Sequence, residues 1–323
     1  MKELIIGKND AGQRLDRFLD KAVPLLPASL CQKYLRLKRV KVNGKAARRD
    51  TRLAEGDQLQ LYIADAFFEK PTEANAYLKI STPRLSIVYE DENLLLADKK
   101  PGVLCHSAEE SDVSKTLIAN IQAYLYQNGQ WKPQEEHAFT PALCNRIDRN
   151  TGGIVIAAKT AEALRILNEK IRDHELDKRY LCVVLGRPSP PSGKLEGYLF
   201  KDAAKNRVYV RKDMEKGARS AATEYSTLCS KNGLSLVQCR LLTGRTHQIR
   251  AQMAAAGWPL LGDGKYGGQS AQAGGEKGQA LYSYRLTFTF PTDAGALNYL
   301  RGKTFTVDSV EFAEKLFPGY DYH

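Results

Sequence analysis

The sequence lacks paired cysteines, long apolar runs and nucleotide- or metal-binding motifs. Its six cysteines are scattered along 323 residues, without a Cys-x-x-Cys pair or a Cys/His cluster. This usage is typical of reduced, mostly buried thiols, and it predicts no structural zinc site.

No stretch approaches the roughly 18 uninterrupted apolar residues that indicate a membrane-spanning helix. The first ten residues, MKELIIGKND, contain an apolar patch of only three residues. We therefore expect neither a signal peptide nor a membrane partner, and we predict a cytoplasmic location.

The sequence also has no Gly-x-Gly-x-x-Gly after a strand, no Walker A loop and no His-Glu-x-x-His pair. These motifs bind dinucleotides, nucleotide phosphates and catalytic zinc, respectively. Their absence argues against a nucleotide cofactor and against a metal hydrolase. Any chemistry is then expected to use ordinary side chains, without cofactor or metal.

Positive charge, in contrast, is in excess. Lys and Arg number 48 against 37 Asp and Glu, which gives a formal net charge of +11, and such an excess favours a polyanionic partner. Between Ala28 and Arg52, nine basic residues are opposed only by Asp50. The excess is therefore concentrated in one short segment.

This segment predicts a helix followed by a hairpin. Ser29 and Gln32 have the spacing of a capping box, and Asn43-Gly44 is a strong turn signal between alternating runs. With the preceding QRLDRFL run, this order resembles the S4 RNA-binding domain, which grips structured RNA through phosphates and shape. The basic side chains that we expect to contact RNA are Lys33, Arg36 and Arg39.

One position departs from the S4 pattern. The family usually has glycine before the hairpin strand, where this sequence has Lys38. A lysine there must adopt the helix-ending conformation that glycine normally supplies. We therefore expect the charge pattern to be retained, whereas the geometry of the turn is in question.

The remainder of the chain mixes strands and helices. Residues 65–84 lack a clear period and contain two prolines, so we interpret them as a linker between a domain of residues 1–64 and a domain of residues 85–323. Thr160 can cap a helix with an apolar stripe, and Thr246 can cap another that ends at Gly257. Strands are predicted within 85–99, 154–159, 178–186 and 235–242, a further helix within 115–126, and a loop at 267–279.

Three separated segments of the larger domain resemble the signature segments of one known enzyme family. KKPGVLCH (99–106), NRIDRNTGG (145–153) and LLTGRTHQIR (241–250), the last continuing into GWPLLGDGKYG, resemble the signature segments of the RluA family of RNA pseudouridine synthases. The S4-like unit in front matches the arrangement of the family's larger bacterial members. The resemblance implies an α+β fold, with a small helix-and-hairpin domain followed by a mixed, mainly antiparallel sheet flanked by helices and loops.

The resemblance also implies roles for particular residues. Asp148 would be the catalytic nucleophile, attacking either C1′ of the target ribose or C6 of uracil, and Arg250 the cation that holds it ionised and oriented. Because the target uridine must leave its stack, Arg146 would occupy the vacancy and Tyr180 would receive the base. Ile249 and Arg245 are further substrate-binding candidates. Taken alone, Asp148 would be a turn cap and Tyr180 a core residue.

Two positions next to the nucleophile depart from the family pattern. Asn145 stands where the family most often has His, and Gly153 where it usually has Ser. Asn cannot titrate, which argues against a general base at that position. For His106 and His247 we expect packing and hydrogen bonding rather than metal binding. For Lys100, Arg245 and Lys265 we expect phosphate contacts or scaffolding.

These observations predict an enzyme that isomerises uridine to pseudouridine in structured RNA. The most plausible substrate is large-subunit (23S) ribosomal RNA, free or in pre-ribosomal particles, and the protein is expected to be a monomer. The alternative is a non-catalytic RNA-binding or ribosome-assembly factor on the same fold. An S4-tethered methyltransferase would need a glycine-rich nucleotide-binding turn, and the sequence has none.

Overall fold

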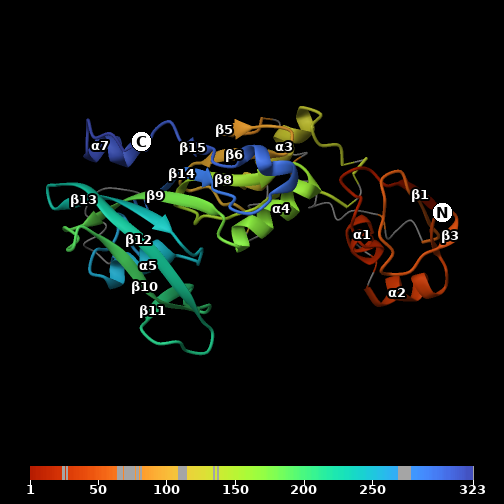
Figure 1. Ribbon diagram of the computed structural model, residues 1–323, viewed down its shortest axis with the longest axis horizontal. Coiled ribbons are helices and arrows are strands. Elements are labelled where there is room, and N and C mark those ends of the chain that lie inside the picture. Colours follow the sequence, from red (N-terminus) through yellow and green to blue (C-terminus); the bar gives the residue numbers. More distant parts are fainter. Residues whose placement is uncertain are drawn as a thin grey trace.

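The computed structural model (Figure 1) describes residues 1–23, 26, 28–63, 68, 77, 80, 82–107, 115–133, 135–136, 138–267 and 278–322. Most of the predicted linker at 65–84 and of the predicted loop at 267–279 therefore lies outside the described residues, as does the side chain of Ser29. Across the part of the chain that the structure describes, no helix has the length and apolar character needed to cross a membrane.

The N-terminal unit packs two helices against a small antiparallel sheet. The helices are α1 (Leu15–Ala22) and α2 (Ala28–Arg36), and the sheet has the order β1-β4-β2-β3. Its strands are β1 (Lys2–Ile5), β2 (Val40–Val42), β3 (Lys45–Ala46) and β4 (Gln58–Leu61). The predicted hairpin is confirmed, because Asn43 and Gly44 turn the chain with φ of 50° and 76°. Strand β1 was not predicted, because its apolar patch is too short to show a period.

Lys38 has the left-handed conformation that the sequence required of it, with φ 56°. The N–H of Arg39 donates to the carbonyl of Tyr34 at 2.9 Å, and the N–H of Lys38 to that of Leu35 at 3.1 Å. This pair of bonds is the Schellman motif that normally ends a helix at glycine. The lysine thus ends α2 in the usual way, and its neighbours Lys33, Arg36 and Arg39 remain exposed.

The larger unit is built on one long sheet of eleven strands in the described residues, with the order β11-β10-β12-β13-β9-β14-β8-β6-β5. Strand β15 adds to β14 and β7 to β8, and every pairing is antiparallel except that of β14 with β8. The strands are β5 (Ile87–Glu90), β6 (Leu94–Lys99), β7 (Ala142–Leu143), β8 (Gly152–Ala158), β9 (Leu176–Leu185), β10 (Ser192–Asp202), β11 (Arg207–Arg211), β12 (Ala218–Lys231), β13 (Leu234–Leu241), β14 (Leu281–Phe288) and β15 (Thr304–Thr306). The mixed, mainly antiparallel α+β fold is confirmed.

Helices cover both faces of this sheet, because alternate residues of β6 and β8 point to opposite sides. Leu96 and Ile156 join a core with α4 (Ala161–Arg172), η4 (Gly295–Leu300) and α7 (Glu311–Leu316). Leu95 and Val155 join a second core with α3 (Leu117–Gln127). Helix α5 (Gln248–Ala255) packs on β9 and β13 in a third cluster. The predicted Thr160 cap of α4 is confirmed, at 3.1 Å from the Ala163 N–H.

The two units touch through the segment that precedes β7. The N–H of Ala138 donates to Oδ1 of Asp10 at 2.9 Å, and Asn9 donates to Glu136 at 3.0 Å. Ala138 is also part of the apolar core of the N-terminal unit. Figure 1 shows α2 along the lower edge of the N-terminal unit, and α5 in the other unit.

Candidate active site

Asp148 lies in the loop between β7 and β8, and hydrogen bonds on both sides of Asp148 fix this loop. The N–H of Thr151 donates to the carbonyl of Asp148 at 3.1 Å, and Gln279 donates to the Thr151 hydroxyl at 3.2 Å. Asn145, which replaces the usual His, accepts from the N–H of Ile156 at 2.8 Å and so ties the loop to β8. The role of Asn145 in this structure is therefore to hold the backbone.

Gly152 and Gly153 leave no room for a side chain. A Cβ at Gly152 would lie 2.2 Å from the ring of Tyr282, and one at Gly153 would lie 2.2 Å from the carbonyl oxygen of Ser283. Gly153 also has φ +112°, which side chains rarely adopt. These close approaches place β14 directly beside the start of β8, where the two strands pair in parallel.

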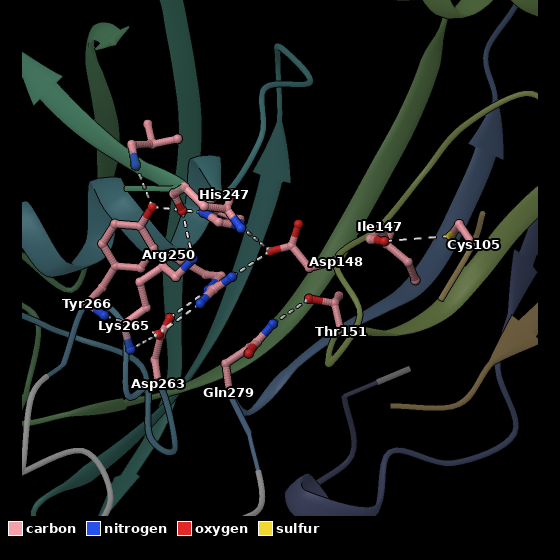
Figure 2. A network of polar contacts seen from close by, with 12 residues as sticks. Cys105, Ile147, Asp148, Thr151, His247, Arg250, Asp263, Lys265, Tyr266 and Gln279 are labelled. Carbon is pink, nitrogen blue, oxygen red and sulfur yellow. Dashed lines mark hydrogen bonds and ion pairs between the residues drawn. The ribbon is translucent and has the colours of Figure 1, made fainter. Parts of the chain in front are cut away.

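Arg250 binds Asp148, as the sequence predicted across about a hundred residues. Nη1 of Arg250 donates to Oδ2 of Asp148 at 2.8 Å, and Figure 2 shows this contact from α5 to the β7–β8 loop. The side chain of Arg250 is 8% exposed and that of Asp148 is 24% exposed. Among the residues that the structure describes, Oδ1 of Asp148 meets no donor. Arg250 therefore holds Oδ2 of Asp148, whereas Oδ1 is available to contact a substrate.

Asp263 is a second carboxylate on Arg250, and the sequence reasoning missed it. It accepts from Nε at 2.7 Å and from Nη2 at 3.0 Å, and it is 1% exposed. Burial lowers the pKa of Arg250, but the bonds and charge of Asp263, aided by Asp148, raise the pKa overall. The aspartate between two glycines in LLGDGKYG was the available signal, because a carboxylate in such a turn can reach a cation on a neighbouring helix.

Lys99 connects the first and second signature segments, and it too was missed. Its side chain is buried and donates to the carbonyls of Lys100, Val103 and Arg149 at 3.2, 2.7 and 2.9 Å. Burial lowers the pKa of Lys99 to about 8, although the nearby charges of Cys105, Asp148 and Asp98 raise it. The N–H of Gly102 also donates to the Arg149 carbonyl at 2.9 Å. The backbone next to Asp148 is thus anchored to the end of β6.

His247 lies beside Asp148. Its Nδ1 is 2.8 Å from the hydroxyl of Tyr266, and its Nε2 is 3.8 Å from Oδ2 of Asp148 (Figure 2). The predicted hydrogen bonding is confirmed, but its position facing Asp148 was not foreseen. The predicted Thr246 cap of α5 is wrong, because His247 itself is the N-cap residue, in a left-handed conformation. The predicted helix end at Gly257 is confirmed, with φ +90° there.

Tyr180 and Ile249 lie together in one apolar cluster, and Ile147, next to Asp148 in the β7–β8 loop, packs against it. Burial raises the pKa of Tyr180 to about 12, a hydrogen bond with Ser283 opposes this, and the Asp148 charge adds to it. The phenol is therefore neutral near pH 7. The structure brings Asp148, Arg250, Tyr180 and Ile249 to one place.

The remaining predicted residues lie outside this core. Arg146 is exposed. The partial burial of His106 lowers the pKa of its imidazole, and the charge of Arg146 lowers it further. Arg245 donates to the carbonyl of Ser220 at 3.1 Å. Lys100 pairs with Asp98 at 2.6 Å, and Lys265 donates to the carbonyl of Asn206 at 2.7 Å. Lys33, Arg36 and Arg39 lie on the N-terminal unit, in or just after α2. Within the described ranges, no group of His, Cys, Asp and Glu side chains could hold a metal ion.

Solved structures with the same fold are pseudouridine synthases. Human RNA pseudouridylate synthase domain containing 4 aligns with a TM-score of 0.54 and 18% identity, covering 74% of this chain and 93% of that one. Human RNA pseudouridylate synthase domain containing 1 aligns with a TM-score of 0.52 and 19% identity, covering 75% and 97%. The fold is thus that of the pseudouridine synthases.

Sequence comparison identifies the family. The RNA pseudouridylate synthase family model matches residues 93–255. An uncharacterized RNA pseudouridine synthase of Mycoplasma genitalium is 30% identical over 99% of this chain and 98% of its own length. Ribosomal large subunit pseudouridine synthase C of Escherichia coli K12 is 28% identical over 90% and 89%. The chain belongs to the RNA pseudouridylate synthase family and is of the RluA type, an isomerase that acts on RNA.

Proposed function

We propose that this enzyme converts uridine to pseudouridine in large-subunit (23S) ribosomal RNA, with Asp148 as the nucleophile. The main support for this proposal is the ion pair between Asp148 and the buried Arg250, in which Nη1 lies 2.8 Å from Oδ2. It holds Oδ2 of the carboxylate in place, while the other oxygen, Oδ1, stays available for attack. The choice of RNA rests on the relatives named ribosomal large subunit pseudouridine synthase C.

Two routes fit this arrangement. In one, Oδ1 attacks C1′, the C1′–N1 bond breaks with its electron pair leaving on uracil, and the rotated base then bonds through C5 as the aspartate leaves. In the other, Oδ1 adds to C6, the C1′–N1 bond breaks, the bound base rotates and bonds to C1′ through C5, and the aspartate then leaves C6. In both routes C5 loses its proton and N1 gains one. Both routes therefore release the hydrogen of C5.

The target base has to reach Asp148 from outside a helix or stack. Tyr180 and Ile249 form an apolar wall beside the nucleophile, and we infer that the flipped uracil packs against it, with the neutral Tyr180 ring as the flat partner. Arg146 is exposed in the same loop. Its guanidinium is suited to fill the space that the base leaves, because it can stack and also contact phosphate.

We further propose that residues 1–64 are an S4-like RNA-binding domain, joined by a linker at 65–84 to the catalytic domain of residues 85–323. Exposed Lys33, Arg36 and Arg39 in or just after α2 support this, because cations on one face bind structured RNA through its phosphates. Arg245 would contact phosphate near the catalytic site. We also propose that the enzyme acts as a monomer, and the meeting of Asp148, Arg250, Tyr180 and Ile249 within a single chain is compatible with this.

Tritium release tests the substrate class. Transcripts of large-subunit and small-subunit ribosomal RNA are prepared with 5-tritiated uridine and incubated with the full chain. We expect tritium to be released from the large-subunit transcript, and the small-subunit transcript is the matched control. Release from the small-subunit transcript alone would contradict the proposed substrate.

A further inference from the structure

His247 has a backbone conformation that needs an explanation. It is the N-cap residue of α5 with φ 52° and ψ 22°, and its side chain makes no capping bond. Residues other than glycine rarely adopt this left-handed conformation, and such strain concentrates at functional sites. The effect here is to place the imidazole between Tyr266 and Asp148 (Figure 2).

The contacts of Tyr266 determine which nitrogen of His247 carries the hydrogen. The Tyr266 hydroxyl accepts the N–H of Val208 at 2.9 Å and lies 2.8 Å from Nδ1 of His247. It has one hydrogen to donate, and the described residues offer no other acceptor for it. We infer that Tyr266 donates to Nδ1, because this arrangement lets the hydroxyl accept from Val208 and donate to His247 at the same time. The imidazole hydrogen is then on Nε2.

The position of Asp148 favours the same tautomer. Nε2 of His247 lies 3.8 Å from Oδ2 of Asp148. An N–H there is attracted to the carboxylate, whereas a lone pair would face the lone pairs of Oδ2. At 3.8 Å this contact is longer than a hydrogen bond, so a small closing movement would be needed to form one. Catalytic hydrogen bonds are often long before the substrate binds.

The surroundings also keep the imidazole neutral. Burial lowers the pKa of His247, and the charges of Arg250 and Lys265 lower it further, while those of Asp148 and Asp263 oppose them. The N-terminus of α5, where His247 lies, disfavours a cation as well. A neutral donor orients the carboxylate without adding a second full charge to it. An imidazolium would stabilise the free carboxylate more than the transition state in which its charge is lost.

We propose that His247 is a positioning residue for the isomerisation. Its Nε2–H tautomer, fixed by the Tyr266 hydroxyl and the Val208 N–H, presents a donor to Oδ2 of Asp148 beside Arg250 and keeps Oδ1 turned toward the substrate. The inference rests on the proposed function, because it requires that Asp148 attacks through Oδ1. It extends the site to the β10–β11 hairpin, which supplies Val208.

Nitrogen-15 NMR of the full chain, labelled at histidine, tests the tautomer without using activity. The signals of His247 are assigned by their loss in His247→Gln. At pH 7 we expect the neutral form with the hydrogen on Nε2, and in Tyr266→Phe we expect a mixture of tautomers. A hydrogen on Nδ1, or an imidazolium at pH 7, would overturn the proposal.

Steady-state kinetics test the positioning. His247→Ala is expected to lower kcat by roughly 10- to 100-fold, the range that a misplaced reacting group produces, with little change in KM. His247→Gln, which keeps an N–H at the ε position, should recover part of the loss. Tyr266→Phe should move the acid limb of the kcat profile to higher pH, because the neutral imidazole loses its donor. The matched control is Tyr299→Phe, because the hydroxyl of Tyr299 binds Asp91 outside the site. This variant should keep the kcat profile of the wild type.

These outcomes separate the inference from the proposed function. If Asp148→Asn is inactive and His247→Ala has the wild-type kcat, the positioning role is wrong and the nucleophile stands. If Asp148→Asn retains the wild-type rate, the proposed function itself is wrong, whatever the tautomer of His247.

Discussion

Asp263 binds Arg250 with both carboxylate oxygens, at 2.7 and 3.0 Å, whereas Asp148 takes a single bond from the same guanidinium. Asp263 thus fixes the buried guanidinium of Arg250, and one remaining N–H of Arg250 binds Asp148. This arrangement fixes Arg250 beside Asp148 and leaves the second oxygen of Asp148 without a bond to the guanidinium, as the proposed role of Asp148 requires.

Asp263→Asn is therefore expected to destabilise the protein and to reduce kcat. Removing one partner of a buried ion pair costs about 3–5 kcal/mol, and Asp263 is 1% exposed. Urea unfolding and tritium release measure the two effects. Asp173→Asn is the control, because it removes an exposed carboxylate from Arg172 and should leave stability unchanged. Wild-type stability in Asp263→Asn would contradict the assigned role.

Lys99 is expected to make stability rise with pH in the alkaline range. Its pKa is lowered from 10.5 to about 8 in the folded protein, so between these values the unfolded chain binds more protons than the native state. The free energy of unfolding then rises with pH, by at most about 1.4 kcal/mol per pH unit from this group. Below pH 8 both states hold the proton and the contribution is flat.

Urea unfolding between pH 7 and pH 10 measures this slope. The rise should be smaller in Lys99→Met than in the wild type, and it should persist in Lys100→Met, which removes a side chain that is 62% exposed. Equal slopes in wild type and Lys99→Met would show that Lys99 is not the group responsible.

Gly153→Ser, which restores the residue usual in the family, is expected to destabilise this chain. The added Cβ would lie 2.2 Å from the Ser283 carbonyl oxygen at φ +112°, and unfavourable backbone conformations alone cost about 1–3 kcal/mol. Thermal unfolding measures the loss. Gly7→Ala, whose Cβ meets only the Glu135 carbonyl oxygen at 4.0 Å, is the control. A serine variant as stable as the wild type would mean that β14 can move away.

Replacing Lys33, Arg36 and Arg39 together with glutamine is expected to weaken RNA binding and to flatten its salt dependence. Each phosphate contact contributes about 0.7–0.9 to the slope of log K against log salt, so the slope should fall by up to about 2–3. The matched control replaces the exposed cations Arg172 and Lys303, which lie on the catalytic unit. An unchanged slope would exclude the basic segment as an RNA contact.

The sequence predicted the parts of the site that local patterns carry. The capped helix α4 and the Asn43-Gly44 hairpin follow from short-range chemistry, and the structure confirms both. Asp148, Arg250 and Tyr180 came from the family resemblance, and their roles stay predictions. Even the left-handed Lys38 could be foreseen, because the end of α2 requires that conformation.

What the sequence could not predict depends on contacts between distant segments. The bidentate bond of Asp263 requires the turn after α5 to fold back under Arg250. The position of His247 depends on its own left-handed backbone, where a pattern of Thr before a helix indicated Thr246 as the cap. The three carbonyls around Lys99 come from two separate loops, and no spacing in the chain shows that these loops meet.

The central claim is that Asp148 is the nucleophile, and Asp148→Asn tests it most directly. The variant keeps the size of the side chain and can still accept from Arg250, so RNA binding, measured in parallel, should remain close to that of the wild type. We predict that tritium release from large-subunit transcripts falls to the level without enzyme. Release at the wild-type rate by a variant that binds RNA normally would contradict the account.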